Sequence, residues 1–245
     1  MKYSNIQKAT FIKRPNRFIA EVEIEGQKEI VHVKNTGRCK ELLIPGAEVW
    51  LTAPGTPDRK TKYDLVAVRK SNGILFNIDS QAPNKVVKEW LEKKDYDLIK
   101  PEYTYGDSRI DFYMEKAVRG KRYLKEDRIL AGKQSLGENS ISEKERFLME
   151  VKGCTLEVDG IGYFPDAPTE RGVKHIYELI KAKEEGYNAA LAFVIQMDGV
   201  KEVRPNIETH PEFGIAFEEA KKAGVKTVFY TCHVTPDELV IVGMT

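Results

Sequence analysis

The sequence predicts a mixed α/β protein, in which a small N-terminal β-barrel precedes a mixed β-sheet flanked by helices. Two observations support this prediction. Residues 1–80 consist of short runs that alternate apolar and polar residues, separated by turns, which is typical of β-strands. Beyond residue 80, segments with apolar residues at helical spacing alternate with strand-like runs. The 245 residues are therefore expected to form two domains, 1–80 and 81–245.

The barrel prediction rests on five strand-like runs with no helix among them. In "RFIAEVEIEG", Phe18 and Val22 fall on one face and glutamates on the other. "KEIVHVK" and "AEVWLT" follow, and "YDLVAVRKSNGILFNID" indicates a hairpin around the Asn-Gly turn at Asn72. These strands favour an oligonucleotide-binding (OB) barrel, although an SH3-like barrel fits the same pattern.

The second part begins with "PNKVVKEWLEKK", which predicts a helix over residues 83–94. "PTERGVKHIYELIKAKEEG" predicts a long helix that ends at Gly186, and "PEFGIAFEEAKKAG" predicts a third helix. The strand-like segments are "YTYGDSRIDFYM", "FLMEVKGCTLEVDG", "NAALAFVIQM" and "VKTVFYTC". Three strands in succession, followed by alternating helices and strands, imply a mixed sheet.

Residues 115–149 are rich in charge and show little apolar periodicity, so they are expected to form an excursion beyond the sheet. Their basic excess would suit a flap over a polyanion, and a solvated excursion fits equally well.

Composition excludes several classes of protein. The net charge is only +1, so a nucleic-acid partner must be met by a local patch rather than by the whole surface. Cys39, Cys154 and Cys232 are too few and too scattered for a disulfide framework or a zinc site. No segment is apolar enough to span a membrane and no leader is evident. We therefore expect a cytoplasmic protein with no membrane partner.

An acidic residue stands two positions before a lysine in four places: Asp58–Lys60, Glu92–Lys94, Glu150–Lys152 and Glu219–Lys221. This spacing alone is therefore weak evidence for a catalytic site. Only Glu150 and Lys152 lie in an apolar, strand-like run, where alternation places both on one face. Asp111 lies between apolar residues on the preceding strand, and pairing of the two strands would bring it beside Glu150.

Two neighbouring carboxylates repel each other, and a hard divalent cation relieves that repulsion. We therefore expect Asp111 and Glu150 to bind Mg²⁺ or Mn²⁺, with Glu102 as a further metal ligand. Lys152 can orient or deprotonate an attacking water, or stabilise the charge of a phosphorane. The pattern predicts a catalytic site of Asp111, Glu150 and Lys152 that cleaves phosphodiesters.

The pattern of Asp111 followed by Glu150-x-Lys152 resembles the core of the PD-(D/E)XK nuclease superfamily, with Ile110 in place of its proline. The four segments "NTGRCKELLIPG", "GDSRIDF", "EVKGCTL" and "YFPDAPTERGVKH" together resemble the sugar fermentation stimulation protein A family, over essentially the whole chain. This resemblance implies an OB barrel, a nuclease-like domain, DNA binding and a regulatory role in sugar (maltose) metabolism.

Several basic and polar residues are candidates for binding nucleic acid. Residues 1–20 contain basic and aromatic residues but no acidic one, so Arg14 and Arg17 are expected to contact phosphate, with a solvated face as the alternative. Asn35 and Thr36 form a turn from which Arg38 projects. Most such turns are only turns, but one rich in backbone donors can hold a phosphate.

The start of the long helix supplies a second group of candidates. Thr169 is expected to cap the helix, and Arg171, Lys174 and His175 are expected on one side of it, where Arg171 and Lys174 could hold phosphates. In a purely structural interpretation, Asp166 and Thr169 are caps and the basic residues are solvated. Asp166 and His175 are secondary candidates.

Three functions compete. The first is a metal-dependent nuclease, for which DNA is favoured over RNA as the partner. The second is a non-catalytic DNA-binding regulator of sugar (maltose) metabolism genes, which keeps the nuclease fold as a scaffold. The third, a glycosidase, lacks an aromatic platform for a sugar near Asp111 and Glu150. The intact set of two carboxylates and a lysine favours the nuclease.

Overall fold

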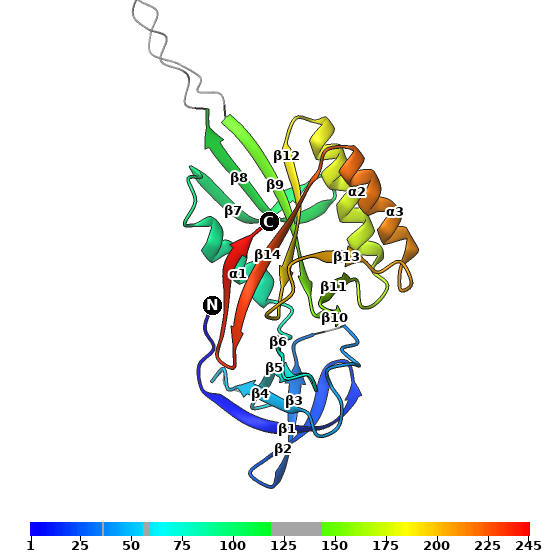
Figure 1. The fold of residues 1–245 in the computed structure, drawn as a ribbon. Helices are drawn as coiled ribbons and strands as arrows, with labels where there is room; N and C mark the ends of the chain where they lie inside the picture. Colours follow the sequence, from blue (N-terminus) through cyan, green and yellow to red (C-terminus); the bar gives the residue numbers. More distant parts are fainter. Residues whose placement is uncertain (36, 56–58, 119–143) are drawn as a thin grey trace, which may run out of the picture.

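A computed structural model describes residues 1–35, 37–55, 59–118 and 144–245. The chain forms a β-barrel at one end and, stacked on it, a larger sheet with helices on its faces (Figure 1). The predicted fold class is confirmed.

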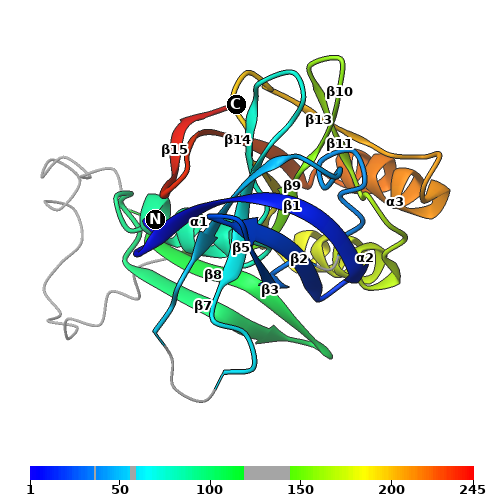
Figure 2. The same cartoon turned by 90° about the horizontal axis from the view of Figure 1, so that it is seen from below.

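The N-terminal barrel has the strand order β3-β2-β1-β4-β5-β6, and parallel pairing of β3 with β5 closes it. Viewed from below, β1 crosses in front of the other strands (Figure 2). The strands are β1 (Ile6–Asn16), β2 (Ile19–Ile24), β3 (Gln27–Val33), β4 (Glu48–Thr52), β5 (Asp64–Arg69) and β6 (Leu75–Asn77).

The five strands predicted from sequence correspond to β2 to β6, and the strand β1 was missed. β1 pairs with both β2 and β4, so it is central to the barrel. Only Ala9 and Phe11 are buried along it, and it contains Pro15 near its end. Its position between two strands, rather than an apolar pattern, makes it a strand.

The larger sheet has the order β15-β14-β12-β9-β8-β7 and is mixed, as predicted. β7, β8 and β9 pair antiparallel, β12 pairs parallel with both β9 and β14, and β15 adds an antiparallel edge. The strands are β7 (Leu98–Tyr105), β8 (Ser108–Ala117), β9 (Lys144–Cys154), β12 (Asn188–Ile195), β14 (Lys226–Thr235) and β15 (Glu238–Met244). A small second sheet contains β10 (Leu156–Val158), β11 (Ile161–Phe164) and β13 (Val203–Pro205). β7, β11, β13 and β15 were not anticipated as separate strands, and the segment predicted as one strand over residues 103–114 divides at a turn between Tyr105 and Ser108.

Helices cover both faces of the larger sheet, and Figure 1 shows α2 and α3 side by side on one of them. Buried residues of α2 and α3 cluster with Leu148 of β9, and those of α1 cluster with Met149, the next residue. This alternation follows from the strand geometry. The helices are α1 (Ala82–Leu91), α2 (Glu170–Glu184) and α3 (Pro211–Lys222). α1 therefore ends three residues before the predicted Lys94.

The predicted excursion over residues 115–149 is too long at both ends. Glu115 to Ala117 complete β8, and Lys144 to Met149 begin β9. Glu115, Lys116 and the residues 144–146 are consecutive charged residues that lie exposed or half-buried at the ends of these strands, so no apolar alternation marked them as strand. Residues 119–143 lie outside the described residues.

The barrel is joined to the larger sheet around Gln196, just after β12. The side-chain amide of Gln196 donates to the carbonyl oxygen of Asn77 at 3.2 Å, to its Oδ1 at 2.8 Å and to the carbonyl oxygen of Asp79 at 3.1 Å. Gln196 is 1% exposed and Asp79 is fully buried, with Lys34 2.9 Å away as its counter-charge. Because buried polar groups require partners, these contacts fix the barrel against the sheet.

The cysteines Cys39, Cys154 and Cys232 are buried and unbonded to each other, in agreement with the sequence prediction. No helix in the described part of the chain is long and apolar enough to cross a membrane.

We expect Gln196→Ala to lower the free energy of unfolding by about 1–3 kcal/mol, because it removes a buried donor that three oxygen acceptors at the junction share. Guanidinium unfolding measures this change. Gln27→Ala, at an exposed position in β3, is the matched control and should shift stability by less than about 0.5 kcal/mol. Equal losses for the two variants would contradict the role of Gln196.

Candidate metal and nuclease site

Asp111 lies where the pairing of β8 with β9 stops. The last paired residues are Phe112 and Met149, and beyond them the main-chain N–H of Val151 donates to Oδ2 of Asp111 at 2.7 Å. Asn84, in the first turn of α1, donates to Oδ1 of Asp111 at 2.6 Å. Both oxygens of this carboxylate are therefore oriented, one by β9 and one by α1.

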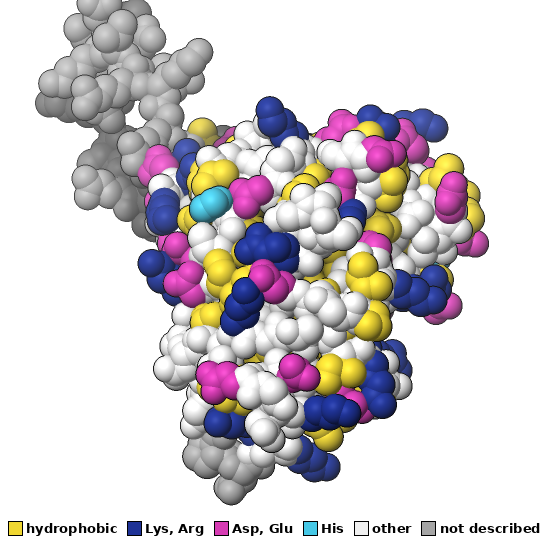
Figure 3. Space-filling model, turned by 60° about the horizontal axis from the view of Figure 1, so that its bottom comes forward, with side chains coloured by type: hydrophobic (Ala, Val, Ile, Leu, Met, Phe, Trp, Pro, Cys, Tyr) yellow, Lys and Arg dark blue, Asp and Glu magenta, His cyan; other side chains and the backbone are white. Residues whose placement is uncertain are grey.

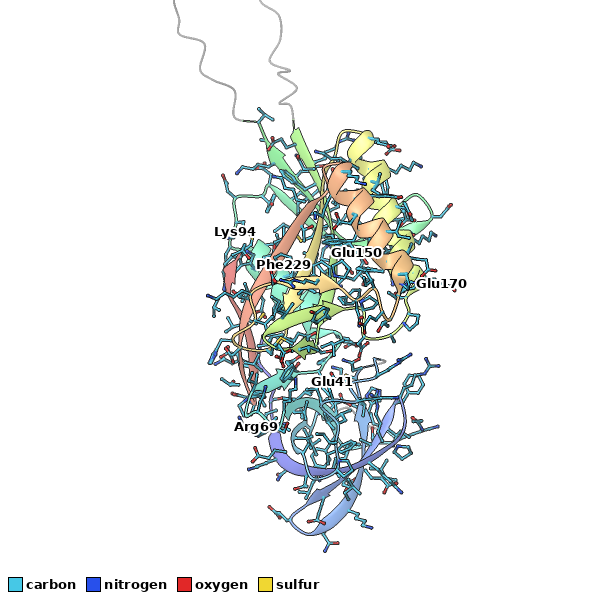
Figure 4. The ribbon with its side chains drawn as sticks, turned by 45° about the vertical axis from the view of Figure 1, so that its right-hand side comes forward. Glu41, Arg69, Lys94, Glu150, Glu170 and Phe229 are labelled. Atoms are coloured by element: carbon cyan, nitrogen blue, oxygen red, sulfur yellow. The ribbon has the colours of Figure 1, made fainter. Side chains whose placement is uncertain are left out.

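Glu150 extends from β9 toward α2, and Figure 4 places it between that helix and the sheet. It is only 3% exposed. Its Oε1 accepts a hydrogen bond from Nζ of Lys152 at 2.6 Å and also contacts Nδ1 of His175. Its Oε2 is buried and has no hydrogen-bond partner. One oxygen of Glu150 thus has two partners, and the other is buried without one.

The two carboxylates differ in their acidity. Burial, together with the negative charge of Glu150, raises the pKa of Asp111 to about 6, against the opposing effect of its hydrogen bonds. Burial also acts to raise the pKa of Glu150, but the hydrogen bond from His175 and the charge of Lys152 outweigh it and hold that pKa below its usual value. A cation between the two groups would relieve the repulsion that Asp111 experiences.

The donors present fit a hard divalent cation. Asp111 and the open Oε2 of Glu150 are carboxylate oxygens, which Mg²⁺, Mn²⁺ and Ca²⁺ prefer. Among the described residues, no group of three or more His, Cys, Asp or Glu side chains is placed to hold a metal. Two carboxylates leave the other coordination positions to water and substrate, which is usual for Mg²⁺.

The structure does not bring Glu102 to this pair, contrary to the sequence prediction. Glu102 occupies the register position opposite Asp111, between Pro101 and Tyr103, which both pair with β8. Its φ of 54° departs from strand geometry, and its side chain is 59% exposed and 3.2 Å from Arg109. Glu102 therefore lies on a neighbouring strand, β7, and the local backbone turns its carboxylate away from Asp111.

Two family models match the chain. Residues 81–238 match the sugar fermentation stimulation protein RE (restriction-endonuclease-like) domain, and residues 12–78 match the SfsA N-terminal OB domain. The chain belongs to the sugar fermentation stimulation protein (SfsA) family. The predicted resemblance is thereby confirmed, and the OB barrel is favoured over the SH3-like alternative.

Relatives cover the chain almost completely. A sugar fermentation stimulation protein homolog of Clostridium beijerinckii is 49% identical over 243 residues, which cover 98% of this chain and 96% of that protein. The homolog of Desulfitobacterium hafniense (strain DCB-2) is 48% identical over 242 residues, which cover 98% and 94%. The solved structure of Pyrococcus furiosus SfsA in complex with Ca²⁺ has a TM-score of 0.77 and 26% identity, and the match covers 100% of this chain and 96% of that one.

A cleft of about 390 Å³ lies between the OB barrel and the RE domain of this SfsA chain. Arg17 and Asn35 line it from the barrel, and Gly153 and Thr169 line it from the RE domain. Gly153 directly follows Lys152, so the cleft adjoins the end of β9 that carries the two charges. The carboxylates themselves do not form its wall.

At the start of α2, Thr169 caps the helix as predicted, because its Oγ1 accepts a hydrogen bond from the N–H of Gly172 at 3.0 Å. Figure 4 labels the next residue, Glu170, at this end of the helix. Asp166 is not a cap. Its Oδ2 accepts from the N–H of Cys39 at 3.3 Å, so Asp166 instead joins the RE domain to a loop of the barrel.

The sequence predicted that Arg171, Lys174 and His175 lie on one side of α2. In the structure they do not. His175 is 4% exposed and faces the sheet, and Nε of Arg171 lies 3.3 Å from its Nε2. Lys174 is exposed and pairs with Glu178 at 3.7 Å. Residues 171 and 175 are four apart and meet, whereas 174 is rotated away by about 100° from its neighbour.

In the barrel, Arg14 and Asn35 hold a loop in shape. The guanidinium of Arg14 donates at 2.6–2.9 Å to the carbonyl oxygens of Arg17, Asn35, Gly37 and Arg38. Oδ1 of Asn35 accepts from the N–H of Gly37 at 2.7 Å. Both side chains thus bind main-chain groups of the loop rather than projecting toward a ligand. Thr36 lies outside the described residues.

Arg17 and Arg38 form a basic rim with Lys40 around a shallow pocket beside the cleft. The Arg17 guanidinium also lies 5.1 Å from the centre of the Phe18 ring, and 49% of Phe18 is exposed. Basic and acidic side chains are interspersed on this end of the molecule (Figure 3), so the rim is a local patch. Phosphate contact by these residues stays a prediction.

The sequence missed two residues that shape the site. Asn84 follows Pro83 at a helix start, and nothing in its spacing connects it with Asp111. Gly153 has no room for a side chain, since a Cβ would lie 2.7 Å from Cγ of Pro83 and would overlap Gln196. This glycine lets α1 and the end of β12 approach the two charged residues. Both contacts arise only when distant segments pack together.

We expect the stability of metal-free Asp111→Asn, relative to metal-free wild type, to rise as the pH rises from about 4 to 7. In wild type, the folded pKa of about 6 exceeds the ordinary aspartate value of 3.8, so the folded state binds the proton more tightly than the unfolded state does. The contribution of Asp111 to the free energy of unfolding of wild type therefore falls through this range, by at most about 3 kcal/mol.

Urea unfolding at several pH values, with a chelator present, measures this difference. Asp107→Asn, in the exposed turn between β7 and β8, is the control and should follow the wild-type curve. Parallel curves for Asp111→Asn and wild type would show that the Asp111 pKa is not raised.

Proposed function

We propose that this SfsA-family chain is a divalent-metal-dependent phosphodiesterase that cleaves nucleic acid, with DNA as its preferred substrate. The observation that carries the proposal is the buried carboxylate of Glu150, whose Oε2 has no partner while Asp111 and Lys152 flank it. A protein that only binds DNA gains nothing from two negative charges beside a phosphate path, whereas a metal site requires them.

Asp111 and Glu150 would hold Mg²⁺ or Mn²⁺, and the complex of the Pyrococcus furiosus relative with Ca²⁺ supports binding of a divalent cation by this chain. The cation would supply Lewis acidity toward a phosphodiester oxygen. Val151 and Asn84 hold the two oxygens of Asp111 in place, so its carboxylate is oriented before any ligand arrives. Such preorganisation removes the need to reorient the ligand during the reaction.

Lys152 is the third member of the site. Its ammonium group donates to Oε1 of Glu150, and 13% of its side chain remains exposed. It therefore places a positive charge at the border between the buried carboxylate and solvent, where a phosphate can approach. A lysine in this place can orient the attacking water. It can also donate a hydrogen bond to a phosphate oxygen on which negative charge develops.

The path of the nucleic acid would follow the cleft between the barrel and the RE domain. Arg17 lines this cleft and belongs to the basic rim with Arg38, and Thr169 lies at its other wall, at the positive end of the α2 dipole. A strand bound there would pass beside β9 and the carboxylates.

We expect Asp111→Ala, Glu150→Gln and Lys152→Ala each to reduce cleavage of labelled DNA, with Mg²⁺ or Mn²⁺ present, by a factor of about 100 or more. Each change removes a metal ligand or the charge beside the phosphate. The rate is measured on single- and double-stranded DNA and on RNA of the same sequences.

Lys221→Ala is the matched control for this experiment, because Glu219 and Lys221 repeat the same spacing on the exposed side of α3. It should cut as wild type does. Cleavage that survives both Asp111→Ala and Lys152→Ala would place the chemistry elsewhere. Binding without cleavage of any substrate by wild type would favour the non-catalytic regulator.

We expect Arg17→Ala and Arg38→Ala to weaken DNA binding and to reduce the slope of log K against log salt concentration. The slope should fall by about 0.7–0.9 for each phosphate that the protein no longer neutralises. Fluorescence anisotropy between about 50 and 200 mM salt measures it. Arg204→Ala is the control, since Arg204 is paired with Glu202 on another surface. An unchanged slope for both rim variants would remove the barrel from the interface.

A further inference from the structure

His175 connects the buried Glu150 to the surface of α2. One ring nitrogen, Nδ1, contacts Oε1 of Glu150, and the other, Nε2, lies 3.3 Å from Nε of Arg171. His175 is 4% exposed, whereas Arg171 is exposed. The three side chains therefore form a row from solvent to the site.

The row has one consistent arrangement of protons. A guanidinium stays charged in proteins and can only donate hydrogen bonds, so Nε2 of His175 must accept from Arg171. The ring proton then lies on Nδ1 and is donated to Oε1 of Glu150. Arg171 therefore selects the tautomer of the ring.

This arrangement decides which oxygen of Glu150 is open. Oε1 receives both the Nδ1 proton of His175 and the ammonium of Lys152, while Oε2 has no partner. With the proton on Nε2 instead, Nδ1 would present a lone pair to Oε1, and the carboxylate would be repelled from this orientation. The tautomer of His175 therefore determines the orientation of the Glu150 carboxylate.

We propose that Arg171 and His175 are positioning residues that hold Glu150 with Oε2 available to the cation; this inference rests on the metal site of the proposed function. Neither residue touches the cation or the substrate in this role. The cap at Thr169 fixes the first turn of α2, and the four-residue spacing then brings Arg171 onto His175. Partners of this kind typically change metal affinity 10- to 100-fold when they are removed.

The tautomer is tested by long-range ¹H–¹⁵N NMR of the His175 ring in the metal-free protein at neutral pH. We expect the proton on Nδ1 in wild type and in Lys174→Met, which removes a neighbouring positive charge that does not contact His175. Arg171→Met should lose the preference for Nδ1. A proton on Nε2, or a doubly protonated ring, in wild type would overturn the inference.

Metal affinity is tested by calorimetric titration with Mn²⁺. His175→Leu should weaken binding about 10- to 100-fold, and Arg171→Met should weaken it in the same direction. His175→Asn should restore most of the affinity, because the asparagine amide can donate from nearly the position of Nδ1. Arg171 is exposed, so its variant provides a result even if His175→Leu does not fold.

The outcomes separate the two proposals. If wild type binds Mn²⁺ and the affinity is unchanged in both His175→Leu and Arg171→Met, the positioning role is wrong and the metal site stands. If His175→Asn binds as weakly as His175→Leu, donation from Nδ1 is not what matters, which also overturns the inference. If wild type does not bind Mn²⁺, the metal site of the proposed function is wrong, and this inference falls with it.

Discussion

The burial of one negative charge shapes this site more than any other interaction. Glu150 is 3% exposed between a sheet and a helix, where an ionised carboxylate without compensation would be strongly destabilising. Lys152, on the same face of β9, and His175, from α2, both compensate it through Oε1. The second oxygen is left without a partner, and the nearby Asp111 has a raised pKa. A divalent cation would resolve both of these imbalances together.

The position of the barrel is the second constraint on function. Gln196 and Asp79 bury polar groups at the junction, and Asp166 accepts from the main chain of Cys39 on the barrel side. Separating buried polar groups from their partners costs free energy, so these contacts hold the barrel and the RE domain in one arrangement. The cleft between them is therefore a fixed feature beside β9, and any polymer that follows it encounters both parts of the molecule.

Periodicity predicted most elements because their burial is regular. The apolar residues alternate along β2 and form stripes along α2 and α3 because each of these elements buries one face. It failed at β1, where few side chains are buried, and at the ends of β8 and β9, where charge concealed strands. The assignment of Glu102 as a metal ligand failed as well, because its backbone conformation turns the side chain to solvent. In each case, pairing or a local φ angle outweighed the apolar pattern.

The sequence by itself determined that Glu150 and Lys152 share a face of a strand, since side chains alternate strictly along β-structure. It also determined the family, through motifs spread over the whole chain. Only the tertiary structure decided that Asn84 orients Asp111, that His175 rather than Lys174 reaches Glu150, and that Glu102 does not. These contacts join residues on separate elements, whose distance depends on how helices pack on the sheet, and local spacing carries no record of that packing.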